Sequence, residues 1–540
     1  MRKGLTMYLN RRNFLKCSAA MGCGISLLGA LDADKSPRRY HACLSRQACE
    51  ANPELLHVVR DAGVTDIWQA AFFYGHWYDT VDGLKKGRAQ VESLGLRWHP
   101  LNVPLGHPGD SLGDATGQTA LTPPAHWRMA ERADGTAHSG TSLHEPATAE
   151  NVAAVREIAS LNPDILFLDD DFRLAVGPGV IGGCFCAEHR ERFLQTGGYS
   201  ESAWEELRDD VRARRLSPLL RSWVEFTCDE LTACFQAQQD AAPDLRLGNM
   251  VMYLGAEKAG IRLADYRDAP FRVGELMFHD ASFERLKGKT DELFSVLFHR
   301  RFARPDWAWS ETTAFPADQL SARNLAGKLA ISTIADVRNT MFMSGLTPFP
   351  IEHWATLTPA MAKQARVHAR IAGHTPRGPF KQYWGEAQRY VGDDQPYSLF
   401  LAAGMPFEVV EALPDDGWTF LSDFDARALE TRALKPGSGG VVTRQALAAA
   451  PEASRAIEED LSGLFALKRE LVGAGYAGPW VEDDKPVVCA WYPTAGAVLL
   501  WNPSSEREQF QLRAGDFSRS VEVDGLDVEL LEGPELRGVH

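Results

Sequence analysis

Residues 163–173 read Pro-Asp-Ile-Leu-Phe-Leu-Asp-Asp-Asp-Phe-Arg. The apolar run at 165–168 is short and follows a proline, which predicts a buried β-strand. Three adjacent carboxylates end it: Asp169, Asp170 and Asp171. Three acids so close together cannot all ionise without cost, so we expect a raised pKa for at least one, as a general acid requires. An acidic loop that caps the next helix is the alternative, although a cap needs only one acid.

Strand and helix patterns alternate on both sides of this stretch, from about residue 38 to residue 375. The expected strands cover 39–44, 66–74, 96–103, 165–168, 245–252, 273–278, 307–310 and 340–343. Eight such repeats predict an α/β fold of the (β/α)8 TIM-barrel class, in which active sites lie at the C-terminal ends of the strands.

The remainder of the chain predicts smaller domains. Short apolar runs and a helical pattern at 454–471 indicate a small α/β domain, and the alternating pattern that follows indicates a β-sandwich. The expected boundaries are 1–33 for an export signal, 36–375 for the barrel, 376–478 for the α/β domain and 479–540 for the sandwich.

The N-terminus carries Arg11-Arg12-Asn13-Phe14-Leu15-Lys16, which looks like a twin-arginine export motif. The weakly apolar stretch at 17–31 is rich in small residues and too short for a confident membrane span. We therefore expect a protein exported by the twin-arginine route, periplasmic or secreted, with no membrane span. Cys43 and Cys49 could form a disulfide in such a compartment.

Composition narrows the class of ligand. The net charge is −15 and no long basic run follows the N-terminus, which argues against a nucleic-acid partner. The chain contains 14 tryptophans, and because aromatic faces stack on the apolar faces of sugars, this mildly favours a carbohydrate ligand. Many tryptophans in a large core would explain the same count. The composition is also compatible with a homo-oligomer.

A second carboxylate, Glu311, follows the seventh expected strand in Trp307-Ala308-Trp309-Ser310-Glu311-Thr312-Thr313. Carboxylates after strands four and seven would face each other across the barrel mouth. Such a pair is the minimum equipment for hydrolysing a glycosidic bond, because one acid protonates the leaving oxygen and the other attacks or activates water. A helix-capping acid is the alternative for Glu311.

These motifs resemble those of the family 42 β-galactosidases of glycoside hydrolase clan A. In that family, strand four ends in Asp-Asn-Glu and is followed by a Cys-x-Cys-x-x-Cys segment and a Phe. Here the corresponding residues are Asp169-Asp170-Asp171, Cys184-Phe185-Cys186-Ala187-Glu188-His189 and Phe193. Glu311, the helix at 323–336 and Phe342 resemble the nucleophile region, and Glu352-His353 resembles a sugar-binding pair after strand eight. A flavodoxin-like domain and a β-sandwich after the barrel also match in order.

The resemblance implies a retaining exo-glycosidase with Glu311 as the nucleophile and Asp171 in the place of the acid/base. The chain departs from the family there, because Asp171 replaces a Glu that is longer by about 1.5 Å, and Asp170 replaces the Asn that binds the sugar 2-hydroxyl. A wider carboxylate gap would favour inversion. We therefore expect a sugar specificity different from that of the family.

Further residues are expected to contact the sugar or to orient the acids. Arg173 could fix Asp169 or Asp171 by a charged hydrogen bond, or be a surface partner. His279 and Asp280 could bind a sugar hydroxyl, although a satisfied core histidine is an equal alternative, and Trp354 could line a subsite.

The segment Cys184-x-Cys186-x-x-His189 offers three ligands for one structural zinc ion, since thiolate and imidazole are the right donors. His144 is the candidate for the fourth ligand, because the family takes one from that loop. The alternative is two packed thiols and a surface histidine. An exported glycoside hydrolase is thus the leading hypothesis. A carbohydrate-binding barrel that has lost its acid/base is the second, and a uronate lyase, for which no basic cleft is evident, is the third.

Overall fold

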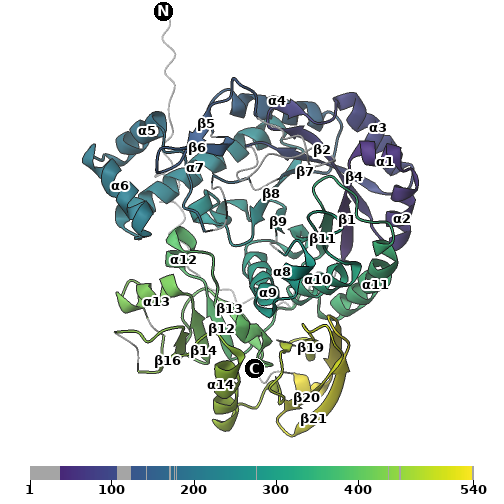
Figure 1. Ribbon diagram of the computed structural model, residues 1–540, viewed down its shortest axis with the longest axis vertical. Helices are drawn as coiled ribbons and strands as arrows, with labels where there is room; N and C mark the ends of the chain where they lie inside the picture. The colour runs from purple at the N-terminus through teal and green to yellow at the C-terminus, as the bar shows by residue number, and fades with distance from the viewer. Residues whose placement is uncertain are drawn as a thin grey trace, which may run out of the picture. The chain divides into compact units, whose positions relative to one another are not determined.

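The computed structural model describes residues 37–105, 123–141, 143–169, 172–174, 177, 179–274, 277–435, 437–448 and 452–537. Its first part is a closed barrel of eight parallel strands, as the sequence predicts (Figure 1). The barrel strands are β1 (Arg39–Cys43), β2 (Asp66–Phe73), β4 (Arg97–Val103), β7 (Ile165–Leu168), β8 (Arg246–Met252), β9 (Phe271–Gly274), β10 (Ala308–Thr313) and β11 (Asn339–Met343). Closure comes from pairing of β1 with both β2 and β11.

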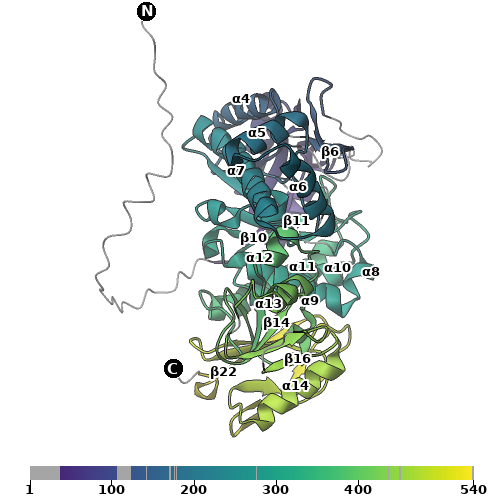
Figure 2. The same ribbon diagram turned by 90° about the vertical axis from the view of Figure 1, so that its left-hand side faces the viewer.

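Helices follow the barrel strands and cover their outer face. They are α1 (Arg46–Ala51), α2 (Glu54–Ala62), α3 (Val81–Glu92), α4 (Ala147–Ala159), α5 (Ala187–Gly197), α6 (Ser202–Ala213), α7 (Pro218–Ala241), α8 (Asp280–Phe283), α9 (Leu286–Arg300), α10 (Ala322–Ile334) and α11 (His353–Ile371). The strand β3 (His76–Trp77) and the hairpin of β5 (Met129–Glu131) and β6 (Ala137–Thr141) add short antiparallel pairs. Helices α5, α6 and α7 lie together in both views (Figures 1 and 2).

Two barrel strands differ from their expected bounds in a way that affects the site. The sixth, β9, covers Phe271–Gly274 and so begins two residues before the expected start at 273. The seventh, β10, continues to Thr313, so Glu311 lies within the strand and its N–H and C=O groups belong to the sheet. Both differences arise because a strand end is set by pairing with its neighbours, which the apolar pattern of one strand does not contain.

The next part is a five-stranded parallel sheet with the order β13-β12-β14-β15-β16. Numbered along the chain, this order is 2-1-3-4-5, the flavodoxin-like arrangement. Its elements are β12 (Phe380–Tyr383), α12 (Glu386–Val391), β13 (Phe407–Val410), β14 (Trp418–Leu421), α13 (Asp423–Glu430), β15 (Gly440–Thr443), β16 (Ser454–Ala456) and α14 (Leu461–Gly473). The expected helix at 454–471 was wrong at its start, since Ser454–Ala456 pairs with β15 and the helix begins at Leu461, after its N-cap Asp460.

The C-terminal part contains two three-stranded antiparallel sheets, β17-β20-β21 and β18-β19-β22. The strands are β17 (Pro479–Val481), β18 (Val488–Tyr492), β19 (Ala497–Trp501), β20 (Glu508–Ala514), β21 (Phe517–Val523) and β22 (Val528–Glu532). Alternate residues such as Cys489, Leu500, Phe510 and Val521 form one apolar cluster shared by both sheets. The two sheets therefore pack face to face as the expected β-sandwich.

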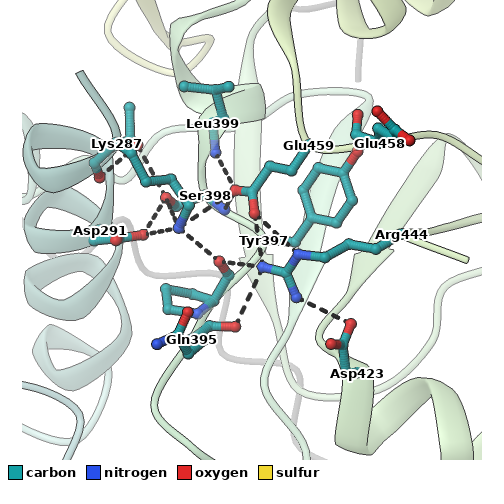
Figure 3. A network of polar contacts seen from close by, with 12 residues as sticks. Lys287, Asp291, Gln395, Tyr397, Ser398, Leu399, Asp423, Arg444, Glu458 and Glu459 are labelled. Carbon is teal, nitrogen blue, oxygen red and sulfur yellow. Dashed lines mark hydrogen bonds and ion pairs between the residues drawn. The ribbon is translucent and has the colours of Figure 1, made fainter. Parts of the chain in front are cut away.

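Polar contacts join the barrel helix α9 to the flavodoxin-like part (Figure 3). Lys287 of α9 donates to the carbonyl of Pro396 at 2.9 Å and pairs with Glu459 at 3.4 Å. Glu459 in turn accepts from Arg444 at 2.7 Å. The barrel and this sheet thus share one continuous network of charged groups.

Two further observations concern cysteines and membranes. Cys43 and Cys49 are separate buried thiols, so the disulfide that they could form is absent. Cys43 packs in the barrel interior, whereas Cys49 packs in the apolar layer with Leu55 and Leu56, because β1 and α1 present them to different faces.

Within the described ranges, the structure contains no helix that is both long and apolar enough to cross a membrane.

Candidate active site and metal centre

Asp169 and Glu311 reach the same guanidinium inside the barrel. Asp169 directly follows β7, and its backbone N–H donates to the carbonyl of Asn102 in β4 at 2.6 Å. Its side chain forms an ion pair with Nη2 of Arg272 on β9. The Nε atom of Arg272 lies 3.1 Å from Oε2 of Glu311 on β10. The acids expected after strands four and seven therefore approach one another through one arginine between them.

Glu311 is held on its other side as well. The Oε1 atom accepts a hydrogen bond of 2.8 Å from the hydroxyl of Thr313, two residues along the same strand face. Glu311 and Asp169 are 6% and 2% exposed, so both carboxylates lie in a setting largely closed to water. Charge interactions are strong in such a setting, which is the condition that acid–base and nucleophilic chemistry requires.

Three other residues of the acidic stretch are Asp170, Asp171 and Arg173. Asp170 and Asp171 lie outside the described residues, so the assignment of Asp171 as the acid stays a prediction. Arg173 is buried, and its Nη1 atom lies 2.8 Å from the sulfur of Met252 at the end of β8. Its burial contradicts the expected surface role, and the expected charged hydrogen bond to Asp169 or Asp171 stays a prediction.

His279 and Asp280 are engaged in capping. The Nδ1 atom of His279 accepts from the backbone N–H of Ser282 at 3.2 Å, so the imidazole is the N-cap of α8. The carboxylate of Asp280 accepts from the backbone N–H of Ser321 at 2.8 Å and from the amide of Asn324 at 2.7 Å. Both side chains therefore already bind protein groups on the connections that follow β9 and β10.

The three expected sugar-binding residues after strand eight lie at the start of α11. Glu352 is exposed at the N-cap and His353 is half-buried, whereas Trp354 is 3% exposed and packs against Phe342 and Phe349. Burial lowers the pKa of His353, and the neighbouring Glu352 opposes that shift. Trp354 thus contributes an apolar face to the core, while Glu352 and His353 keep polar atoms near the surface.

Two large hydrophobic side chains are exposed among the described residues, and both follow barrel strands at their C-terminal ends. Phe315 is 61% exposed and stands two residues after β10, and Ile351 is 40% exposed in the loop after β11. The backbone N–H of Phe315 donates to the carbonyl of Phe278 at 2.9 Å, which fixes its position. An exposed aromatic ring beside a barrel mouth is a surface on which a sugar can stack.

His144, Cys184, Cys186 and His189 converge in a buried cluster that could hold a metal ion. One ligand atom from each residue lies within 4.8 Å of all the others. His144 lies in the loop just before α4, and the other three residues lie at or just before the start of α5. The backbone N–H of Phe185 donates to the carbonyl of Glu131 in β5 at 2.8 Å. The cluster thus joins the loop before strand four of the barrel to the loop after it.

The spacing of the ligand atoms fits a tetrahedral ion. Bonds of about 2.3 Å to sulfur and about 2.0 Å to nitrogen would place neighbouring ligand atoms about 3.5 Å apart. The Nε2 atom of His144 lies 3.7 Å from Sγ of Cys184 and 3.5 Å from Sγ of Cys186. The Nδ1 atom of His189 lies 3.2 Å from Sγ of Cys186.

Each imidazole also has a carboxylate behind it. Nδ1 of His144 lies 3.3 Å from Glu188, and Nε2 of His189 lies 3.8 Å from Glu230. Carboxylates in this position orient histidine ligands and set their tautomer. Burial lowers the pKa of His189 to about 3, so its ring is neutral, the form that binds a metal.

Sequence reasoning did not identify Arg272, Thr313, Glu188 and Glu230. Arg272 carried a signal, because it stands in the four-residue strand Phe-Arg-Val-Gly, where a charge has to be compensated. The expected strand began at 273 and so left this arginine outside. The partners of the histidines come from α5 and α7, and only folding brings them together.

Comparison with known proteins supports the fold. No protein-family model and no curated protein sequence matches this chain. A crystal structure of the cold-adapted β-galactosidase from Rahnella sp. R3 is similar, with a TM-score of 0.59, 9% identity, and coverage of 92% of this chain and 98% of that chain. The β-galactosidase from Bacillus circulans sp. alkalophilus gives a TM-score of 0.57, 11% identity, and coverage of 92% and 99%. The chain therefore has the barrel-plus-domains fold of these β-galactosidases.

Proposed function

We propose that this chain is an exported glycoside hydrolase that cleaves a glycosidic bond with two carboxylates at the C-terminal mouth of the barrel. The observation that carries this proposal is the convergence of Glu311 from β10 and Asp169 from the end of β7 on Arg272. The fold shared with two β-galactosidases adds support. A retaining exo-glycosidase with a sugar specificity other than theirs is the form we propose, because Asp171 stands where the resemblance calls for Glu.

In the proposed reaction, the Glu311 carboxylate attacks the anomeric carbon while the bond to the leaving oxygen breaks. Asp171 donates its proton to that oxygen. Water then attacks the glycosyl-enzyme ester, Asp171 takes up the proton, and Glu311 is released. The hydroxyl of Thr313 holds the attacking carboxylate in place during both steps.

We further propose that His144, Cys184, Cys186 and His189 hold one structural zinc ion. Two thiolates and two imidazoles are a donor set that zinc prefers, and four protein ligands leave no position for a reacting water. The ion would keep the loop before strand four beside the loop that follows the acidic stretch. Its chemistry is charge and ligand bonding, and the hydrolysis remains with the carboxylates.

Turnover of a panel of aryl glycosides tests the proposal. Glu311→Ala should lower kcat by several orders of magnitude on any glycoside that the wild type cleaves. The matched control is Glu529→Ala, which removes an exposed acid on β22 of the sandwich. Asp171→Ala should slow substrates with poor leaving groups far more than those with good ones, because good leaving groups need no proton.

Two outcomes of this panel contradict the proposal. Near-normal activity of Glu311→Ala would remove its carboxylate from the mechanism. Binding of sugars without hydrolysis by the wild type would indicate a carbohydrate-binding barrel that has lost its acid/base.

A further inference from the structure

Arg272 is a positive charge in the interior of the barrel, where a charge without partners would be highly unstable. Its side chain is 0% exposed, and burial lowers the pKa of its guanidinium while Glu311 opposes that shift. Arginine nevertheless stays protonated in proteins, so its charge is available at every working pH. A buried group of this kind needs a partner charge, and its neighbours show what that partner is.

Different nitrogen atoms of the guanidinium meet different carboxylates. Nε faces Oε2 of Glu311 at 3.1 Å, and Nη2 pairs with Asp169. The remaining contacts are soft, since Nη1 lies 3.1 Å from the sulfur of Met341 and Nη2 lies 3.0 Å from that of Met250. The Phe167 ring stacks beside the guanidinium, with 5.5 Å between the ring centroid and Cζ. The side chain of Arg272 is thus packed among apolar side chains, and its charged nitrogen atoms face the two carboxylates.

We propose that Arg272 is a positioning residue that holds Glu311 and Asp169 as oriented carboxylates at the base of the barrel mouth. The role in catalysis rests on the proposed glycosidase function. One cation and two anions leave a net charge of −1, which favours the positive charge that develops on a sugar ring in the transition state. The planar fork of arginine also fixes the two acids relative to each other, which a lysine ammonium could not do.

Other titratable groups face this site, and their states matter for the test. Cys43 of β1 interacts electrostatically with both Arg272 and Glu311, and burial raises the pKa of its thiol to about 12, so it is neutral. Arg173 lies near Met252 at the end of β8. Asp170 and Asp171 follow Asp169 in the chain and lie outside the described residues. Among the described groups, Glu311 and Asp169 are therefore the carboxylates that Arg272 contacts directly.

Arg272→Lys tests the role in catalysis, because it keeps the charge and loses the fork. We expect kcat to fall roughly 100-fold with KM little changed. The acidic limb of the pH profile should move up by about one pH unit or more, because Glu311 loses its close contact with a guanidinium. The matched control is Arg338→Lys, a buried arginine that pairs with Asp336 at 3.6 Å next to β11. An unchanged acidic limb in Arg272→Lys, or the same change in the control, would overturn the proposal.

A stability measurement tests the pairing without relying on activity. Urea unfolding of Arg272→Met should give a lower midpoint at pH 7 than unfolding of Arg272→Met/Glu311→Gln. The single variant buries two uncompensated carboxylates, Glu311 and Asp169, whereas the double variant buries only Asp169. The gap should close as the pH falls and Glu311 takes up a proton. Recovery of folded protein only for the double variant would support the same conclusion. Equal midpoints at pH 7, or loss of folding in both variants alike, would overturn it.

The two experiments separate the two proposals. A stability gap in a protein that cleaves no glycoside would reject the glycosidase function and keep Arg272 as the partner of Glu311. Hydrolysis that depends on Glu311, with no stability gap and no change in the acidic limb, would keep the function and reject the role of Arg272.

Discussion

Lys258→Met should destabilise the protein more than an ordinary core substitution, because it leaves a buried carboxylate without its partner. Lys258 lies in the 3-10 helix η2 (Glu257–Ala259) after β8 and pairs with Asp394 of the flavodoxin-like part. Both side chains are 1% exposed. Lys258 also donates to the carbonyl of Gln388 at 3.2 Å. Removing one member of a buried pair costs about 3–5 kcal/mol, and we expect a loss in that range at pH 7.

The backbone of Lys258 and the carboxylate of Asp394 both contact the loop that follows the acidic stretch. The backbone N–H of Gly182 donates to the carbonyl of Lys258 at 2.6 Å, and that of Gly179 donates to the carboxylate of Asp394 at 2.6 Å. Loss of the pair should therefore also lower kcat, through the loop rather than through the reacting groups.

The effect should depend on pH in one direction. Burial raises the pKa of Asp394 in the folded protein, and Lys258 opposes that shift, so the variant has a still higher value. Below the unfolded pKa of about 4 the acid is neutral in both states and contributes nothing. As the pH rises through the raised folded pKa, its ionisation costs stability, so the deficit of Lys258→Met should grow from pH 4 to pH 7.

Urea unfolding followed by circular dichroism measures these differences. Lys258→Met/Asp394→Asn should recover much of the loss, because Asn can still accept from Gly179 without a charge. The control is Lys289→Met, a lysine that is 4% exposed and contacts the carbonyl of Glu284 and the Phe283 ring. A loss in Lys258→Met below about 1 kcal/mol, or a double variant no better than the single one, would refute the reasoning.

Two further predictions concern the metal and the rim of the barrel. Purified protein should contain about one zinc per chain. Chelation or Cys184→Ser should lower the thermal midpoint of unfolding while kcat of the protein that remains folded stays unchanged. Absence of zinc from protein purified without chelator would contradict this prediction. Phe315→Ala should raise KM for oligosaccharides several-fold more than for small aryl glycosides, since a stacking surface is worth about 0.5–1.5 kcal/mol. An equal effect on both kinds of substrate would argue against a role in stacking.

The barrel was predictable because its signal is local. Each strand is an apolar run followed by a helical period, and eight repeats leave few alternative topologies. The short strand Ser454–Ala456 was not predictable in the same way, because it exists only through pairing with β15. The shift of β9 to Phe271–Gly274 has the same cause, and it left Arg272 out of the expected strand.

The metal cluster shows which contacts can be predicted from residues that are close in sequence. Cys184, Cys186 and His189 are close in sequence, so their convergence follows from a turn into a helix, and the resemblance supplied His144. Other side chains depended on tertiary packing. Trp354 became part of the core because α11 turns it towards Phe342. His279 became a helix cap because its imidazole accepts from the backbone N–H of Ser282.

Covalent trapping tests the central claim most directly. A fluorinated glycosyl donor with a good leaving group, built on a sugar that the panel identifies, should inactivate the wild type and leave its glycosyl group on Glu311. Mass spectrometry of the peptide around 307–313 detects that ester. The account predicts one glycosyl group on Glu311 and no labelling of Glu311→Gln. Labelling of a different carboxylate, or turnover of the donor with inversion and no trapped ester, would contradict it.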